Sequence, residues 1–289
     1  MQGREDGARG TSFRTVAALM AIPVAGLLVF FLWNWVNGGA PPIETVAVKA
    51  QPPIGKTDEA AALPKVTPKK RHRGDIVLII DDLGFDGQPL DRVMALDPNV
   101  NCSILPNGTR AAAFADKLHA RGFEVLCHLP MEPVGSESPG RDAILTSMSD
   151  AEIARLTREN FEAVPFARGV NNHMGSRATT DRRVMTTVLG ALPRGVYFID
   201  SKTSGGSVAA AVARELNVHT ASRHVFLDDT QTVDAVRKQL DALAAAAEKH
   251  GTAIGIGHPH AVTMRVLADE VPRLRERGFR FVRASDVVR

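Results

Sequence analysis

Four short apolar segments of this chain end in acidic or imidazole side chains. They are IVLIIDD (76–82), FEVLCHLPME (123–132), GVNNHMGS (169–176) and AIGIGHPH (253–260). Each segment has the length of a buried strand and is too short for a typical helix. An unpaired charge costs free energy in a protein interior, so such side chains are expected at strand ends that face a site. Asp, His and Glu converging on one point predict a divalent metal site.

The first two segments supply the acidic pair and one imidazole. Asp81 and Asp82 end the first segment, and a turn at the strand end would let both side chains address one site. His128 ends the second segment, and its ring nitrogen suits zinc and related metals. Glu132 follows four positions later, where it could add an oxygen ligand, hold a water molecule or simply brace its loop.

The next candidates lie in the third segment and in FIDSKT (198–203). His173 follows Asn171 and Asn172, a pair whose side chains typically orient loops through local backbone hydrogen bonds. Because His173 has the same placement as the other clusters, we predict that it is a metal ligand. Asp200 ends a further apolar segment and could orient a catalytic His or Lys, or form a simple ion pair.

The fourth segment supplies a candidate acid. His258 and His260 flank Pro259, and either could act as a general acid because histidine titrates near neutral pH. His258 is the stronger candidate because it is nearer to the strand end. A metal ligand or a turn residue is the alternative for both.

Strand-like and helix-like patterns alternate from residue 74 onward, which predicts parallel strands joined by right-handed crossovers. Helix signals include a possible cap at Thr109 and a capping box from Ser149 to Glu152. Seven or eight strands suit a closed or nearly closed barrel with its site at the C-terminal mouth, and an open doubly wound sheet is the alternative. No glycine-rich dinucleotide fingerprint follows the first strand. Strands are predicted at 75–80, 100–105, 123–128, 167–171, 196–200, 218–221, 253–257 and 279–283.

The first quarter of the chain has a different composition. We predict a cytoplasmic tail at 1–14, a membrane anchor at 15–36, a Pro/Ala/Lys-rich linker at 37–73 and the folded domain at 74–289. The anchor prediction rests on an uncharged stretch that ends near two tryptophans, and a cleaved signal peptide is the alternative. Arginines before the stretch favour a single-pass protein of the inner membrane with an exported, periplasmic domain.

Charge and cysteine content add two expectations. The basic run at 69–73 is interpreted as a solvated tether near an anionic membrane surface, so we expect no nucleic-acid partner. Cys102 and Cys127 lie on separate predicted strands and match no metal spacing, which favours buried free thiols. A disulfide between them is left open.

Five motifs occur in an order that resembles the divergent polysaccharide deacetylase family, a relative of the NodB-type carbohydrate deacetylases. The motifs are IDDLG (80–84), HLPMEP (128–133), NNHMGS (171–176), FIDSKT (198–203) and GHPH (257–260). The resemblance covers residues 74–289. It implies a distorted (β/α) barrel of seven to eight mainly parallel strands, one divalent metal ion with zinc as first choice, and removal of N-acetyl or O-acetyl groups from an envelope glycan.

The resemblance also assigns roles to residues. It implies that Asp81 is the base, that Asp82 and His128 bind metal, and that His258 is the acid. Glu132 stands where the second histidine of the family's HxxxH pattern is expected, a departure that His173 could make good from another loop. Asn172, Asp200 and His260 remain candidate supporting residues or ligands.

Two other classes of function are compatible with the sequence. The departure at Glu132 favours a catalytically silent glycan-binding or envelope-scaffold protein on the same fold. Asp and His metal sites also serve phosphate chemistry, so a phosphoesterase is the second alternative. The expected partners are an acetylated glycan and the membrane, the latter through the predicted anchor.

Overall fold

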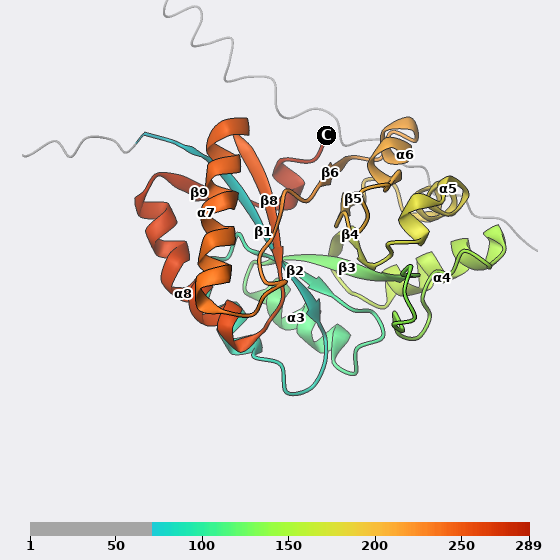
Figure 1. Ribbon diagram of the computed structural model, residues 1–289. Coiled ribbons are helices and arrows are strands. Elements are labelled where there is room, and N and C mark those ends of the chain that lie inside the picture. Colours follow the sequence, from blue (N-terminus) through green and yellow to red (C-terminus); the bar gives the residue numbers. More distant parts are fainter. Residues whose placement is uncertain (1–70) are drawn as a thin grey trace, which may run out of the picture. The chain divides into compact units, whose positions relative to one another are not determined.

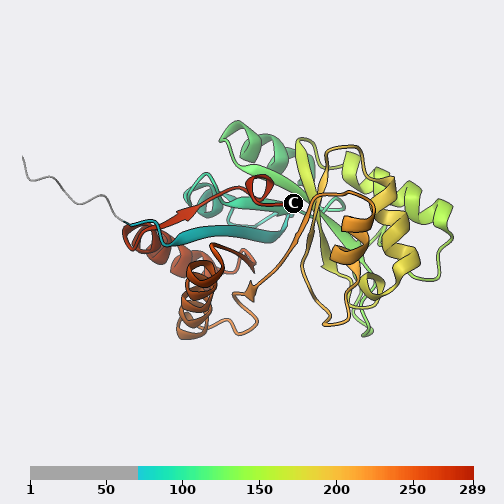
Figure 2. The same ribbon diagram turned by 90° about the horizontal axis from the view of Figure 1, so that it is seen from above.

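The computed structural model describes residues 71–289, which form a parallel sheet enclosed by helices (Figures 1 and 2). The strand order is β6-β5-β4-β3-β2-β1-β8-β7, and β9 also pairs with β1. The strands are β1 (Gly74–Leu83), β2 (Asn101–Ile104), β3 (Glu124–Met131), β4 (Ala167–Met174), β5 (Tyr197–Asp200), β6 (Thr220–Ser222), β7 (Val225–Phe226), β8 (Thr252–Gly257) and β9 (Phe279–Phe281).

The helices lie on the outside of the sheet, and α7 and α8 pack side by side near β1, β8 and β9 (Figure 1). The predicted capping box of Ser149 and Glu152 is present at the start of α4. The predicted cap at Thr109 is wrong, because its hydroxyl donates to Asp86 and Arg110 occupies the cap position without a side-chain bond. The helices are α2 (Leu90–Met94), α3 (Ala111–Ala120), α4 (Asp150–Glu162), α5 (Arg182–Ala191), α6 (Ala209–Glu215), α7 (Val233–His250) and α8 (Ala261–Glu276).

The sheet is rolled into a distorted barrel. Its two terminal strands, β6 and β7, are separated by only two residues of chain, so the ends of the sheet must lie close together. These two residues bridge the gap. Arg223 N donates to Asp200 O at the end of β5 (2.9 Å), and His224 N donates to Ile254 O of β8 (2.8 Å). The predicted (β/α) barrel is therefore confirmed, although the two-residue strand β7 was not anticipated because it is too short to show a period.

Alternate residues of each strand face the inside and the outside of the barrel. The inner cluster is small and includes Val77 and Ile79 of β1 and Ile254 and Ile256 of β8. The outer cluster is larger and holds the intervening residues, such as Leu78, beneath the helices. Because both faces are buried, the strands appear in the sequence as continuous apolar runs rather than as alternating patterns.

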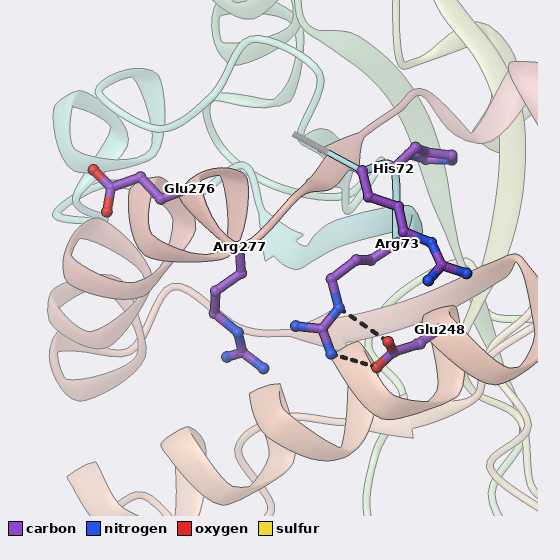
Figure 3. A pocket seen from close by; sticks show the side chains of 6 residues that line it. His72, Arg73, Glu248, Glu276 and Arg277 are labelled. Carbon is purple, nitrogen blue, oxygen red and sulfur yellow. Dashed lines mark hydrogen bonds and ion pairs between the residues drawn. The ribbon is translucent and has the colours of Figure 1, made fainter. Parts of the chain in front are cut away.

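The N-terminal ends of the strands are closed by the segment after β9. Val288 packs inside the barrel, and Thr220 N donates to Arg289 O (3.0 Å). Beside β1, the guanidinium of Arg73 binds the carboxylate of Glu248 on α7 through two bonds of 3.0 and 2.6 Å (Figure 3). The last residue of the basic run is thus tied to the domain by an ion pair that remains exposed at the surface.

Two predictions concern residues away from the barrel mouth. Cys102 and Cys127 are buried free thiols, as expected, and they face the outer helices. The predicted anchor at 15–36 lies outside the described residues. Within 71–289, the helices are too short or too polar to cross a bilayer.

Gly169 offers a test of the inner packing. A Cβ at this position would overlap the ring of Tyr197, which is held in place because its hydroxyl donates to Glu124 (2.7 Å). Gly169→Ala should therefore lower the free energy of unfolding by about 1–3 kcal/mol, measured by urea denaturation. Gly190→Ala is the control, since no atom lies near that position in α5 and alanine should stabilise the helix by about 0.5–1 kcal/mol. Equal stability of Gly169→Ala and wild type would show that the Tyr197 ring can move aside.

Candidate metal and acid–base site

A polar layer lies above the apolar layers inside the barrel. On β1 the inward positions are Val77, Ile79 and then Asp81, and on β8 they are Ile254, Ile256 and then His258. Ile80 pairs with Gly257, so Asp81 and His258 follow at the same level. On the neighbouring strands, the residue two positions after the last inward-facing residue of the lower layers likewise belongs to the polar layer. These residues are Ser103, His128, Asn171 and Ser201.

Asp82 reaches the same site through a backbone irregularity. Its φ of 57° is in the left-handed region, which aspartate tolerates better than most residues, and the pairing of β1 with β2 is irregular between Ile80 and Leu83. In a regular strand Asp82 would point outward, away from Asp81. The irregular turn brings both carboxylates to the barrel mouth, as the sequence led us to expect.

Asp82, His128 and His173 bring one oxygen and two ring nitrogens to a single point. Asp82 Oδ1 lies 3.2 Å from His128 Nε2 and 2.9 Å from His173 Nδ1, and the two nitrogens are 3.3 Å apart. Ligands on a tetrahedral zinc ion with bonds of about 2.1 Å are themselves separated by about 3.4 Å. The spacing is therefore close to that of a coordination sphere.

The burial of this oxygen supports the same interpretation. Asp82 Oδ1 has no solvent contact, and neither imidazole approaches it with hydrogen-bond geometry, so it lacks a donor among residues 71–289. A buried carboxylate oxygen without a donor is costly, and a cation would remove that cost. Burial by itself raises the pKa of Asp82, but the two imidazoles outweigh it and hold this pKa below its ordinary value. These residues fit a divalent cation.

Asp81 lies beneath this cluster with only 2 % of its surface exposed. Asn171 Nδ2 donates to both of its oxygens, at 2.9 and 3.1 Å, and Asp81 Oδ2 is 3.5 Å from His128 Nε2. Burial raises the pKa of Asp81, although His128 and His258 partly oppose that effect. A carboxylate in such surroundings is more basic than one in water and can accept a proton.

His258 lies across the mouth, and Asp228 orients its ring. Asp228 Oδ1 is 3.0 Å from His258 Nδ1, while Oδ2 accepts from the backbone N–H of His258 (2.7 Å) and from Thr263 (2.7 Å). This leaves His258 Nε2 directed toward the site, 3.7 Å from Asp82 Oδ2. Burial lowers the pKa of His258, but Asp228 and the Asp81–Asp82 pair raise it to about 9. His258 is thus protonated at neutral pH.

Several predicted residues have supporting contacts instead. Glu132 accepts from the N–H and the hydroxyl of Thr146 (both 2.6 Å), so it braces the loop after β3. Asn172 donates to Met174 O (2.7 Å) and accepts from Ser201 N (2.9 Å). Asp200 accepts from the N–H of Lys202 and the hydroxyl of Ser207, which fixes the turn after β5.

His260 lies at the edge of the site. Its Nε2 is 3.1 Å from the side-chain amide of Gln231, and its ring centre is 5.6 Å from that of His258. It could complete a ligand group with Asp228 and His258. However, both oxygens of Asp228 are already engaged by His258 and Thr263, so the arrangement suits a proton-holding pair better than a second cation.

Sequence reasoning missed Asp228 and the central place of Asn171. Asp228 follows Phe226 and Leu227 and precedes Asp229, so the pattern of apolar residues before two aspartates occurs twice in the chain. That repetition was a usable signal. Asn171 was noted only as a loop-orienting residue, although it is fully buried and paired in register with His128.

Comparison with known proteins gives a consistent result. The family model described as divergent polysaccharide deacetylase matches residues 78–288, which confirms the resemblance. Over 202 residues, or 70 % of this chain, the uncharacterized protein YibQ of Escherichia coli is 38 % identical and an uncharacterized protein of Haemophilus influenzae is 35 % identical. The matched region spans 63 % and 72 % of those two proteins, less than two thirds of YibQ.

Among solved structures, the uncharacterized protein ATU2773 of Agrobacterium tumefaciens has the same fold. Its TM-score is 0.72 at 21 % sequence identity, and the likeness covers 76 % of this chain and 91 % of that one. At this identity the likeness supports the barrel architecture alone.

The metal ligands can be tested by substitution. Asp82→Asn and His173→Ala should each abolish binding of about one zinc, cobalt, nickel or manganese ion per chain, because each removes one of three converging donors. Elemental analysis of the purified protein measures this. Glu132→Gln is the matched control and should retain the metal, since its carboxylate contacts Thr146 rather than the cluster. Equal loss in Glu132→Gln would place Glu132 among the ligands and contradict the assignment.

Proposed function

The chain belongs to the divergent polysaccharide deacetylase family, and from this premise we propose that it is a metal-dependent hydrolase that removes acetyl groups from an envelope glycan. One observation carries the proposal. The three candidate metal ligands lie between a buried carboxylate, that of Asp81, and the imidazole of His258, which Asp228 holds in place. Hydrolysis of an amide or ester needs such a base and such an acid on either side of the reacting carbon.

Asp82, His128 and His173 would hold the cation. When bound, a divalent cation supplies Lewis-acid stabilisation of negative charge on the acetyl oxygen and makes water more acidic. We propose zinc, because two imidazoles and one carboxylate form a donor set that zinc commonly takes. His173 supplies the second imidazole from β4, so the departure at Glu132 does not reduce the number of nitrogen donors.

Two residues of the chain would transfer protons during hydrolysis. Asp81 accepts a proton from the attacking water, and Asn171 keeps its carboxylate oriented. His258 donates a proton to the departing nitrogen or oxygen, and Asp228 holds its ring with Nε2 toward Asp82. The base and the acid approach the ligand carboxylate from different strands, β1 and the end of β8.

The biological setting of this activity is part of the proposal. We propose an acetylated glycan as partner, carrying N-acetyl or O-acetyl groups. We further propose that residues 15–36 anchor the protein in the inner membrane, with the catalytic domain in the periplasm. The proposal is supported by the composition of the N-terminal segment and by the family to which the domain belongs.

The activity can be tested by acetate release. Zinc-loaded protein should release acetate from N-acetylglucosamine oligosaccharides or O-acetylated oligosaccharides, and Asp81→Asn should reduce the rate by about 100- to 10,000-fold while the metal stays bound. Acetate and metal are both measured in each preparation. Hydrolysis of an aryl phosphate in place of acetate release would favour a phosphoesterase. A metal-loaded protein that binds acetylated glycan without hydrolysing it would favour the silent binding protein.

The pH dependence of acetate release tests the acid. Asp228→Asn removes a negative charge that raises the pKa of His258, so His258 should lose its proton at lower pH than in the wild type. The alkaline fall of kcat should therefore lie at lower pH in Asp228→Asn than in the wild type. Asp200→Asn is the control, because among residues 71–289 the Asp200 carboxylate accepts hydrogen bonds from Lys202 and Ser207 of its own turn and not from His258. An unchanged alkaline limb in Asp228→Asn would remove His258 from the role of acid.

A further inference from the structure

Asn171 forms hydrogen bonds with four other side chains of the polar layer inside the barrel. Its side chain is fully buried, and it lies on β4 directly opposite His128 in the register of the sheet. Its single amide group contacts side chains that come from three other strands and from the turn after β5. These partners are Asp81, Ser103, His128 and Ser201.

The contacts fix which way the amide points. The two oxygens of Asp81 can only accept from the atom that faces them, so that atom is the NH₂ group of Asn171. The amide oxygen then faces Ser103 Oγ and His128 Nδ1, the latter at 3.0 Å. An oxygen accepts and cannot donate, so His128 must carry its hydrogen on Nδ1. In the neutral ring, which is the form that binds a metal, Nε2 then has a free lone pair beside Asp82.

A purely structural role would look different, and the same barrel contains an example. Asn101 on β2 is also fully buried, but its amide donates to Leu78 O and accepts from Ala284 N. Both partners are backbone groups that need pairing in any folded barrel. The partners of Asn171 are instead the proposed base and a proposed metal ligand, and the hydroxyls that surround them.

We propose that Asn171 is a positioning residue that sets two parts of the site through one rigid group. Its oxygen holds His128 in the form that offers Nε2 to the metal, and its NH₂ group aims the carboxylate of Asp81. The amide is planar, so the ligand and the base are fixed relative to each other. The part that concerns Asp81 rests on the proposed function, while the part that concerns His128 requires only that the site binds metal.

Metal binding tests the first contact. We expect Asn171→Ala to weaken the binding of zinc by about 10- to 100-fold in calorimetry, as is typical when the partner of a ligating histidine is removed. The absorption spectrum of the cobalt-loaded protein should change as well. Asn101→Ala is the matched control: it removes an equally buried amide, so it should lose stability but keep the zinc affinity and the cobalt spectrum of wild type.

Asn171→Asp separates the two contacts. A carboxylate of the same shape can still accept from His128 Nδ1, so zinc affinity should stay within about 10-fold of wild type. It cannot donate to the ionised Asp81, and a proton shared between the two acids would block the base. We therefore expect kcat for acetate release, measured at saturating zinc, to fall by about 100-fold or more with little change in KM. This variant carries the test alone if Asn171→Ala does not fold.

The outcomes separate this proposal from the proposed function. Equal zinc affinity in Asn171→Ala and Asn101→Ala would overturn it, as would the loss of zinc from Asn171→Asp or the full rate in that variant. If wild type binds zinc but releases no acetate from any acetylated sugar, the proposed function fails, whereas the calorimetric comparison still decides the contact with His128.

Discussion

The alternation of side chains along a strand governs the whole site. Every second residue of a barrel strand faces inward. Two inward apolar residues deep in the barrel therefore determine which later residue of the same strand faces inward at the mouth. Val77 and Ile79 lead to Asp81, and Ile254 and Ile256 lead to His258. A slip of one residue in either strand would turn the acid or the base toward the outer helices. The apolar interior therefore determines the positions of the polar groups above it.

Asp82 does not follow that alternation, and for this reason its carboxylate lies beside the other two candidate metal ligands, His128 and His173. Because its backbone takes a left-handed conformation, two successive carboxylates enter the same space although a regular strand would separate them. They then experience opposite effects: burial raises the pKa of Asp81, whereas the neighbouring imidazoles lower the pKa of Asp82. Two identical side chains thus become suited to different tasks, one to accept a proton and the other to remain an anion beside a cation.

The sequence predicted the barrel and its strands because apolar runs buried on both faces are easy to recognise. It also predicted which histidines and aspartates gather at the mouth, since each of them ends such a run. It did not reveal that Asp228 lies against His258, nor the way Arg223 and His224 close the barrel. These features depend on register between distant strands. For the same reason the sequence could not decide whether Glu132 binds a metal, holds a water molecule or braces its loop, which is what it does through Thr146.

The pairing of β1 has a consequence for how the chain folds. β1 lies in the middle of the sheet between β2 and β8, yet β8 is among the last strands to be synthesised. Until β8 emerges, one edge of the most apolar strand in the domain remains open to solvent and to other chains. Pairing between strands so distant in sequence is slow, and unpaired edges favour aggregation.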